Sequence, residues 1–288
     1  EDHKVEWIAY PFVAGGSITE LDGKPKSSGK TTLLTHLAAA VIGGHSFMGN
    51  PTLRSSVVYL SEQPPSTFIV ALERAGLLGC EDLHILFWKD AARLTWDATV
   101  KLAAEQCTRR GARLLIVDTL GQFTGLDGDA ENNAGDALAA MRPLQAAAAT
   151  GLGIIASRHE RKSGGEVGDS GRGSSAFAGA VDTIFLLRRM EGRQKGTLRQ
   201  LRAISRLDIP NAFVIELTES GYVNRGSESA VAEMEAQEAI LNAAPSGAGN
   251  AETLKEILAE TGISRSTGQR AMEELIKSER LEVVGSGK

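Results

Sequence analysis

Apolar runs and stretches with helical spacing alternate along the first two thirds of the chain. The apolar runs are short and bounded by turn residues, as buried strands are. Strands alternating with helices favour an α/β fold with a mostly parallel sheet. The candidate strands are Ser17–Leu21, Ser56–Leu60, Leu83–Phe87, Leu114–Val117, Gly153–Ser157 and Thr183–Leu187. The candidate helices are Thr31–Ile42, Ser66–Ala75, Trp96–Arg110 and Glu131–Thr150, the last with Pro143 predicting a kink or break.

The pattern changes after these elements. Leu198–Ile204 and Ala212–Leu217 mix apolar and polar residues, which is typical of edge or antiparallel strands. After Asn224 come turn residues, a helix-like stretch and a cluster of Pro, Gly, Ser and Asn. Such a cluster marks a linker. We therefore expect one domain over residues 1–225 and a smaller one over residues 226–288.

The C-terminal segment has the element order of a winged helix-turn-helix. Two helices are separated by Thr261–Ile263, Ser264 is a candidate N-cap for the second, and Leu281–Val284 reads as a short strand. The second helix of such a domain can enter a DNA major groove. Residues 264–288 hold five basic and four acidic residues, so charge does not distinguish DNA binding from a packing or protein-interaction module.

Composition narrows the class of protein. The 288 residues are 42% hydrophobic and 23% charged, as a globular chain with a sizeable core requires. Cys80 and Cys107 stand alone, without the spacing of a zinc or disulfide framework. The sequence shows neither a signal-like leader nor an apolar run near the ~18 residues of a membrane helix. We expect a cytoplasmic protein without membrane contact.

Charge is uneven along the chain. The net charge of −5 argues against bulk attraction to nucleic acid. Residues 188–206 nevertheless hold seven basic residues and one acidic residue. This basic stripe is either a solvated hairpin face or a local phosphate-binding surface. Its members are Arg188, Arg189, Arg193, Lys195, Arg199, Arg202 and Arg206.

The stretch ITELDGKPKSSGKTTLL, residues 18–34, has the features of a phosphate-binding loop. A strand stops, a loop follows, and a helix begins at a Gly-Lys-Thr triplet. Lys24 stands where the usual pattern has its first glycine, and Gly23 precedes it, so the loop is one residue longer or turns earlier. The candidate phosphate-binding residues are Gly23, Lys26, Ser27, Ser28, Gly29, Lys30, Thr31 and Thr32. ATP and Mg²⁺ are the expected ligands.

Two carboxylates complete the expected site. Asp118 follows the apolar run in RLLIVDTL, where a P-loop protein holds Mg²⁺ together with the Thr31 hydroxyl. The next residue is Thr119, so the adjacent Asp-Glu pair of AAA+ proteins is missing. Glu62 in VVYLSEQPP follows the second strand, where a carboxylate can orient water towards a γ-phosphate.

These segments, with IIASRHERKSGG, GRGSSAFAGAVDTIFLL and LRAISRLDIPNAFVIELTESGYV, resemble RecA-like P-loop ATPases. Their order over residues 7–223 is similar to that of the RepA-type hexameric replicative helicases, the AAA_25 family. The resemblance implies a RecA-like P-loop NTPase core with ATP bound between subunits. It also implies that Lys30, Thr31, Glu62 and Asp118 are the phosphate, metal and base residues.

The resemblance implies further roles for polar residues of the later segments. A residue after the strand Gly153–Ser157 would sense the γ-phosphate, either Arg158 or His159, of which His159 is favoured. An arginine from the neighbouring subunit, Arg206 or its rival Arg172, would stabilise the transferring phosphoryl group. The glycine-rich stretch 161–175 resembles a central-channel loop, in which Arg161 and Lys162 would contact single-stranded DNA. By composition alone this stretch is an ordinary loop.

These expectations describe a hexameric, ATP-driven helicase that moves along single-stranded DNA. Its C-terminal domain would bind duplex DNA or a replication protein. Two other classes fit the sequence. A recombination accessory ATPase would share the nucleotide site, and an ATP-gated regulator would read duplex DNA through the C-terminal domain. KaiC-like phosphotransfer shares the core fold alone.

Overall fold

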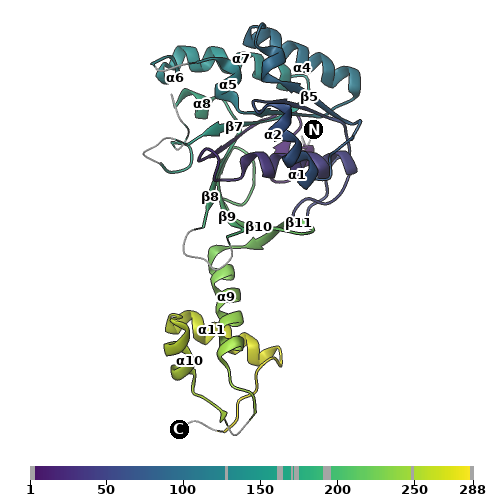
Figure 1. Cartoon of the computed structure of the whole chain (residues 1–288). Helices are drawn as coiled ribbons and strands as arrows, with labels where there is room; N and C mark the ends of the chain where they lie inside the picture. Colours follow the sequence, from purple (N-terminus) through teal and green to yellow (C-terminus); the bar gives the residue numbers. More distant parts are fainter. Residues whose placement is uncertain are drawn as a thin grey trace. The chain divides into compact units, whose positions relative to one another are not determined.

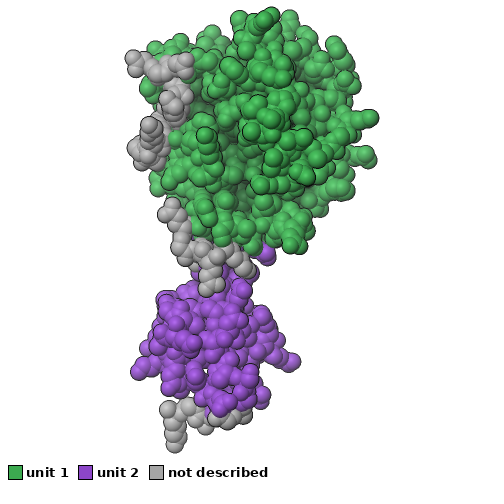
Figure 2. Space-filling model, viewed as in Figure 1, with its two compact units in different colours: residues 1–224 green, residues 225–288 purple. Residues whose placement is uncertain are grey.

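The computed structural model describes residues 4–126, 129–160, 165–169, 171, 175–190, 196–247 and 250–285. The chain divides into two compact units, residues 1–224 and residues 225–288 (Figure 2). The first unit holds the sheet and the predicted phosphate-binding loop, and the second is helical.

A mixed nine-stranded sheet, counted over the described residues, runs through the first unit (Figure 1). Its order is β11-β10-β9-β8-β3-β7-β6-β4-β5. The six strands from β8 to β5 are parallel, and β9 runs antiparallel to both β8 and β10. The strands are β3 (Ile18–Gly23), β4 (Val57–Ser61), β5 (Leu83–Phe87), β6 (Leu114–Asp118), β7 (Gly153–His159), β8 (Thr183–Arg189), β9 (Leu198–Ser205), β10 (Ala212–Thr218) and β11 (Gly221–Gly226). The α/β class and the mostly parallel sheet predicted from the sequence are confirmed.

Helices cover both faces of this sheet, so its central strands are buried on both sides. In β6, Leu114 and Ile116 pack with the helices α1 (Lys30–Gly43) and α2 (Pro65–Arg74). Leu115 and Val117 point the other way, towards α4 (Trp96–Arg110) and α7 (Ala134–Ala148). This two-sided burial explains why the strands read as continuous apolar runs.

Short elements complete the first unit. The strands β1 (Trp7–Ala9) and β2 (Val13–Ala14) form a separate two-stranded sheet that the sequence pattern did not predict. Strand β11 was also missed. The short helices are α3 (Trp88–Ala91), α5 (Leu120–Thr124), α6 (Asp129–Asn132) and α8 (Ala176–Gly179).

The predicted helix 131–150 differs from the observed one. Asn133 caps α7 by accepting hydrogen bonds from the N–H groups of Gly135 and Asp136, so this helix starts at Ala134 and α6 is separate. Of the kink or break predicted at Pro143, the break does not occur, because α7 continues through this residue. The Trp96 indole of α4 donates a 2.7 Å hydrogen bond to the Ala140 carbonyl, which lies one turn before the proline. This contact and the packing of α7 on α4 hold the turn of the helix that contains Pro143.

The second unit contains α9 (Glu228–Ala243), α10 (Leu254–Thr261) and α11 (Arg265–Lys277). They enclose a small core of Ala236, Ile240, Ile257, Ala271 and Leu275. Ser264 caps α11 as predicted, since its side chain accepts from the Thr267 N–H.

The predicted strand of a wing does not form. Residues 281–284 have no strand structure, and Val283 is 65% exposed. A strand needs a hydrogen-bonding partner, and the described part of this unit offers none. The helix-turn-helix order is therefore present without the winged-helix strand.

Candidate nucleotide-binding site

The predicted phosphate-binding residues lie at the carboxyl edge of the parallel strands. Strand β3 leads into α1 on one face of the sheet, and its neighbour β7 leads towards α8 on the other. Gly23 and His159, the last residues of these two strands, are register partners. A crevice opens where neighbouring connections leave for opposite faces, and α/β proteins bind ligands there. The sheet topology therefore places the loop at a ligand-binding edge.

Gly23 provides the close packing that the first glycine of the usual pattern, replaced here by Lys24, would provide. A Cβ at this position would lie 2.6 Å from Ser28 Oγ and 2.9 Å from the Leu187 carbonyl oxygen. No side chain fits between the loop and the neighbouring strand. The loop therefore turns directly after Gly23, and Lys24 occupies an exposed position where glycine is not needed.

Gly29 makes the junction between the loop and α1. It is the N-cap of the helix, with φ 92° and ψ 22°, a left-handed conformation that glycine adopts without strain. A helix N-terminus at the end of a loop is a natural anion-binding site. The arrangement fits a phosphate chain, because only glycine permits both the close approach at Gly23 and the turn at Gly29.

Lys30 extends from the first turn of α1 back across the loop. Its ammonium donates to the Gly23 carbonyl oxygen at 2.8 Å and lies 3.4 Å from His159 Nδ1. Burial lowers the pKa of Lys30, while the carboxylates of Asp118 and Glu62 act in the opposite direction. A buried cation beside a ready-made anion site is available to phosphate oxygens.

Asp118 is the centre of a hydrogen-bond network. Its Oδ2 accepts from the Thr31 hydroxyl at 2.7 Å and from the Tyr59 hydroxyl at 2.9 Å, and its Oδ1 accepts from the Ser157 hydroxyl. The carboxyl is buried. The burial of Tyr59, followed by the charge of Asp118, raises the pKa of Tyr59 well above its ordinary value. Three donors hold the carboxylate rigidly next to the Thr31 oxygen.

This donor set fits Mg²⁺ that arrives with a nucleotide. The described residues contain no group of three or more His, Cys, Asp and Glu side chains able to hold a metal by themselves. Mg²⁺ is usually held by one or two protein oxygens, with water and substrate phosphates completing its shell. Thr31 and Asp118 supply that number of oxygens.

Glu62 follows the last residue of β4 and lines the same cavity as the loop. The Thr119 hydroxyl donates a short hydrogen bond to Glu62 Oε2, and the Glu62 N–H donates to the Asp118 carbonyl at 2.7 Å. Burial raises the pKa of Glu62 and Asp118 acts in the same direction, whereas the hydrogen bond from Thr119 and the charge of Lys30 oppose the rise. The raised pKa makes this carboxylate a better proton acceptor than an exposed glutamate.

The two candidates, Arg158 and His159, are the last residues of β7 and point to opposite sides of the sheet. His159 lines the cavity beside Lys30. Arg158 is turned away, where its guanidinium forms a buried ion pair with Glu20 at 2.9 Å and lies over the Phe177 ring. Only His159 is therefore placed to contact a ligand in the loop.

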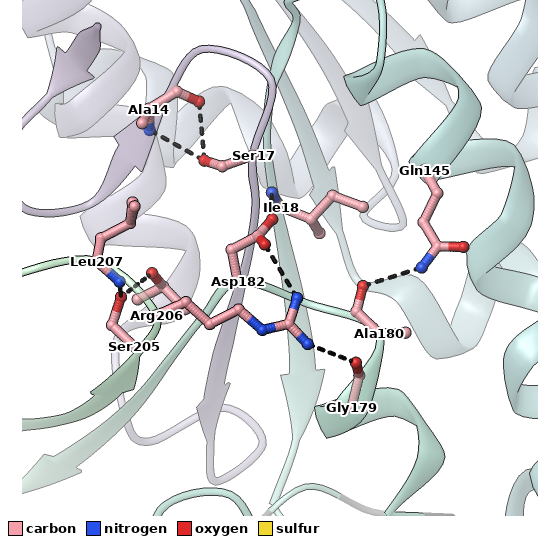
Figure 3. A network of polar contacts seen from close by, with 11 residues as sticks. Ala14, Ser17, Ile18, Gln145, Gly179, Ala180, Asp182, Ser205, Arg206 and Leu207 are labelled. Atoms are coloured by element: carbon pink, nitrogen blue, oxygen red, sulfur yellow. Dashed lines mark hydrogen bonds and ion pairs between the residues drawn. The ribbon is translucent and has the colours of Figure 1, made fainter. Parts of the chain in front are cut away.

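Arg206 lies at the opposite edge of the sheet from the loop. Its guanidinium donates to Asp182 at 3.2 Å and to the Gly179 carbonyl at 3.0 Å, while Asp182 also accepts from the Ile18 N–H at the start of β3 (Figure 3). Arg206 thus does not reach the cavity of its own chain, and a role in a neighbouring subunit stays a prediction. Its rival Arg172 lies outside the described residues.

Most described members of the basic stripe are engaged within the chain. Arg188 pairs with Glu160, Arg202 with Glu166, and Arg199 donates to the Ser28 carbonyl of the phosphate-binding loop. Arg193 and Lys195 lie outside the described residues. So do Arg161 and Lys162, the predicted DNA contacts. The described arginines of the stripe therefore do not form one free phosphate-binding surface.

The site residues surround one cavity of about 450 Å³. Of the predicted set, Lys26, Ser28, Gly29, Lys30, Thr31, Thr32, Glu62, Asp118 and His159 line it. Ser27 is exposed and is not part of this lining. Gly23 is also outside the lining, where it packs between Ser28 of the loop and Leu187. A second cavity of about 580 Å³ adjoins it past Glu62 and His159, with Phe87 and Trp88 in its walls.

Sequence reasoning missed four residues that hold the predicted ones. Tyr59 and Ser157 position Asp118, Thr119 positions Glu62, and the Gln63 amide donates to the Thr31 hydroxyl at 3.3 Å. The available signal was polar residues at or next to the carboxyl ends of apolar strands. The alternation of strand side chains does not reveal which of them face a common centre.

The comparison with protein families agrees with this geometry. The model of the AAA_25 family, described as an AAA domain, matches residues 1–165, more than half of the chain. A search of curated proteins finds no significant match. None of the helices in the described segments is long and apolar enough to cross a membrane.

Proposed function

The chain belongs to the AAA_25 family of AAA domains, and on that premise we propose that it is a magnesium-dependent ATPase that works as a DNA motor. In this proposal six copies form a ring, ATP binds between neighbouring subunits, and hydrolysis moves the ring along single-stranded DNA as a replicative helicase. A nucleotide-binding ATPase is the coarser statement that the family membership supports.

One observation carries the ATPase part of the proposal. Lys30 and Thr31 at the start of α1, Glu62 after β4 and Asp118 at the end of β6 come from three separate segments and line the same 450 Å³ cavity. The Lys30 ammonium would bind phosphate oxygens, and the N-terminus of α1 would add its partial positive charge. The Thr31 oxygen would ligate Mg²⁺, with Asp118 holding it in place. The ion would neutralise charge that develops on the phosphates.

Glu62 would act on the attacking water. Its carboxylate is fixed by Thr119 in the lining of the cavity, so it can accept a hydrogen bond from water and take its proton. His159, which lies beside Lys30, would contact the terminal phosphate and is thereby placed to report its loss. The polypeptide after His159 leads directly into residues 161–175, the stretch predicted to contact DNA.

The DNA part of the proposal rests on the resemblance between residues 7–223 and the RepA-type helicases. In it, Arg161 and Lys162 bind the DNA backbone, and Arg206 or Arg172 completes the site of a neighbouring subunit. The helices α10 and α11 would bind duplex DNA or a replication protein. Particles imaged with a non-hydrolysable ATP analogue and an oligo-dT strand should be closed rings, whereas filaments would favour the recombination ATPase.

Replacing Lys30 with alanine tests the nucleotide site. We expect Lys30→Ala to abolish ATP turnover, because a phosphate-binding cation is lost. The matched control is Lys101→Ala on the exposed face of α4, which should hydrolyse ATP like the unmodified chain. Steady-state hydrolysis by Lys30→Ala at nearly the normal rate would contradict the assignment of the loop.

Strand separation tests the motor. The unmodified chain should displace one strand of a forked duplex in the presence of Mg-ATP, and the Lys30→Ala variant should not. ATP turnover without displacement would leave an ATPase that is not a helicase. Tight, sequence-specific binding of duplex DNA by the full chain, without displacement, would favour the regulator instead.

A further inference from the structure

We propose that Arg199 is a positioning residue of the phosphate-binding loop, which it holds from outside the cavity by fixing the peptide between Ser28 and Gly29. The inference rests on the proposed function, since it concerns the same nucleotide site. It gives Arg199 a different role from the one suggested by its place in the basic stripe.

Arg199 is brought to the loop by the antiparallel pairing of β9 with β8. Its register partner is Arg189, the last residue of β8, and therefore it lies at the carboxyl edge of the parallel strands. Arg199 Nε donates to the Ser28 carbonyl oxygen at 3.0 Å. Nη1 donates to the carbonyls of Gly196 and Leu198 at 2.8 and 2.9 Å. Because the guanidinium is planar and rigid, these three bonds fix its orientation.

The geometry of the peptide bond transmits this contact to the cavity. The bond between Ser28 and Gly29 is trans, so its C=O and N–H point in opposite directions. Arg199 binds the C=O and lies outside the cavity lining, whereas Gly29 is part of that lining. Holding the carbonyl outward therefore directs the Gly29 N–H inward, where an anion at the N-terminus of α1 would accept it.

The surroundings of Arg199 keep it on the loop. A Cβ built on Gly29 would lie 3.8 Å from Arg199 Nε and 4.0 Å from the Tyr222 hydroxyl, so both side chains lie against the outside of the loop. Tyr222 packs edge-on against His36 of α1. Burial lowers the pKa of Arg199 and raises that of Tyr222 to about 12. The guanidinium stays charged, because arginine is not deprotonated in proteins.

Neighbouring arginines show that this contact is specific to Arg199. Arg202 lies on the same strand and pairs with the exposed Glu166, and Arg206 pairs with Asp182 at the far edge of the sheet. Arg202 therefore offers a matched control, with the same charge on the same strand and no contact to the loop.

The test measures binding of ADP and ATP in the presence of Mg²⁺ by titration calorimetry with Arg199→Ala, Arg199→Lys and Arg202→Ala. We expect Arg199→Ala to weaken both nucleotides by roughly ten- to hundred-fold, the loss expected for one charge-assisted hydrogen bond. Arg199→Lys keeps a charged donor and should recover part of the affinity. Arg202→Ala should bind like the unmodified chain.

Kinetics separate positioning from a structural role. An N–H that contacts phosphate equally before and during hydrolysis contributes uniform binding, so Arg199→Ala should raise KM for ATP and leave kcat nearly unchanged. A purely structural role would instead lower the binding-competent fraction at unchanged affinity, an outcome that overturns the proposal. So would equal affinities of Arg199→Ala and the unmodified chain. If the unmodified chain itself binds no nucleotide, the proposed function fails together with this inference.

Discussion

The two walls of the nucleotide cavity hold their polar groups in different ways. In the loop wall, residues 24–30, the contacts run to backbone carbonyls: Lys30 donates to Gly23, Ser28 donates to Lys24, and Arg199 donates to Ser28. The second wall, here called the strand-end wall, consists of Glu62, Asp118 and Thr119 at the ends of β4 and β6. Its contacts join side chains to side chains. The hydroxyls of Thr31, Tyr59 and Ser157 donate to Asp118, and the hydroxyl of Thr119 donates to Glu62. A wall held through its backbone suits the binding of phosphates both before and after hydrolysis. Side chains that are fixed by other side chains suit the placement of a metal ion and a base.

Burial acts on the ionisable groups of the two walls in opposite directions. It lowers the pKa of Lys30 in the loop wall and raises the pKa of Glu62 in the strand-end wall. The charge of Glu62 raises the pKa of Lys30, and the charge of Lys30 lowers the pKa of Glu62, so each charge opposes the effect of burial on the other group. We expect changes of the backbone contacts in the loop wall to alter nucleotide affinity, and changes at Glu62 to alter the rate of hydrolysis at unchanged affinity.

The largest effect expected in the strand-end wall follows replacement of Glu62. Glu62→Gln keeps the shape but cannot take a proton, so ATP hydrolysis should slow by at least ~100-fold, the usual scale for a positioned base. Binding of Mg-ATP, measured by titration, should persist. Glu73→Gln on the exposed side of α2 is the control and should change neither quantity. Loss of nucleotide binding by Glu62→Gln would erase the proposed difference between the two walls.

A smaller effect is expected from Gly23→Ala, at the residue directly before the loop wall. The new methyl group would meet Ser28 Oγ at 2.6 Å and the Leu187 carbonyl at 2.9 Å, so the loop must shift away from β8. We expect a loss of about 1–3 kcal/mol in the free energy of unfolding, the cost typical of overpacking. Nucleotide affinity should fall as well. The measurements are denaturant unfolding and nucleotide titration.

The control for this change is Gly179→Ala in α8, where an added Cβ meets nothing within 4 Å. It should leave both the unfolding free energy and the affinity close to those of the unmodified chain. If Gly23→Ala is equally harmless, the close packing of the loop on β8 is not what requires glycine at this position.

The sequence predicted those parts of the molecule that one strong pattern controls. The apolar runs predicted six parallel strands of the large sheet to within two residues at each end, because strands buried on both faces tolerate few polar residues. The mixed pattern of 198–204 and 212–217 located β9 and β10 equally closely. The Gly-Lys-Thr triplet located the loop for a similar reason, since its geometry requires those residue types.

Other parts depend on contacts between distant segments. Pro143 does not break α7, because α4 packs against that turn. The strand expected at 281–284 does not form, because no other described segment of its unit pairs with it. In the sequence, Arg199 is one member of a basic stripe, and Thr119 is an ordinary residue after a strand. Only the register of β9 and the meeting of β4 with β6 bring them to the loop and to Glu62.

The smallest effect concerns Thr119 and appears mainly at acidic pH. The Thr119 hydroxyl stabilises the charged form of Glu62, so its hydrogen bond lowers the pKa of a carboxyl that burial raises. Thr119→Val removes this bond, and the pKa of Glu62 should rise further. Because the base acts when deprotonated, hydrolysis should then fail at a higher pH during acidification. At pH values above this acidic limb the rates of Thr119→Val and the unmodified chain should converge, because the carboxylate is ionised in both.

The pH dependence of kcat/KM for ATP measures this shift, with Thr119→Ser and Thr108→Val for comparison. Thr119→Ser retains the hydroxyl and should return the acidic limb to its original position. Thr108 donates only to the Ala104 carbonyl on the exposed side of α4, so its replacement should leave the profile unchanged. An acidic limb that does not move in Thr119→Val would mean that Glu62 is not the group whose protonation stops hydrolysis. The strand-end wall would then need another base, and His159, the titratable neighbour of Lys30 in the same cavity, is the residue to replace next.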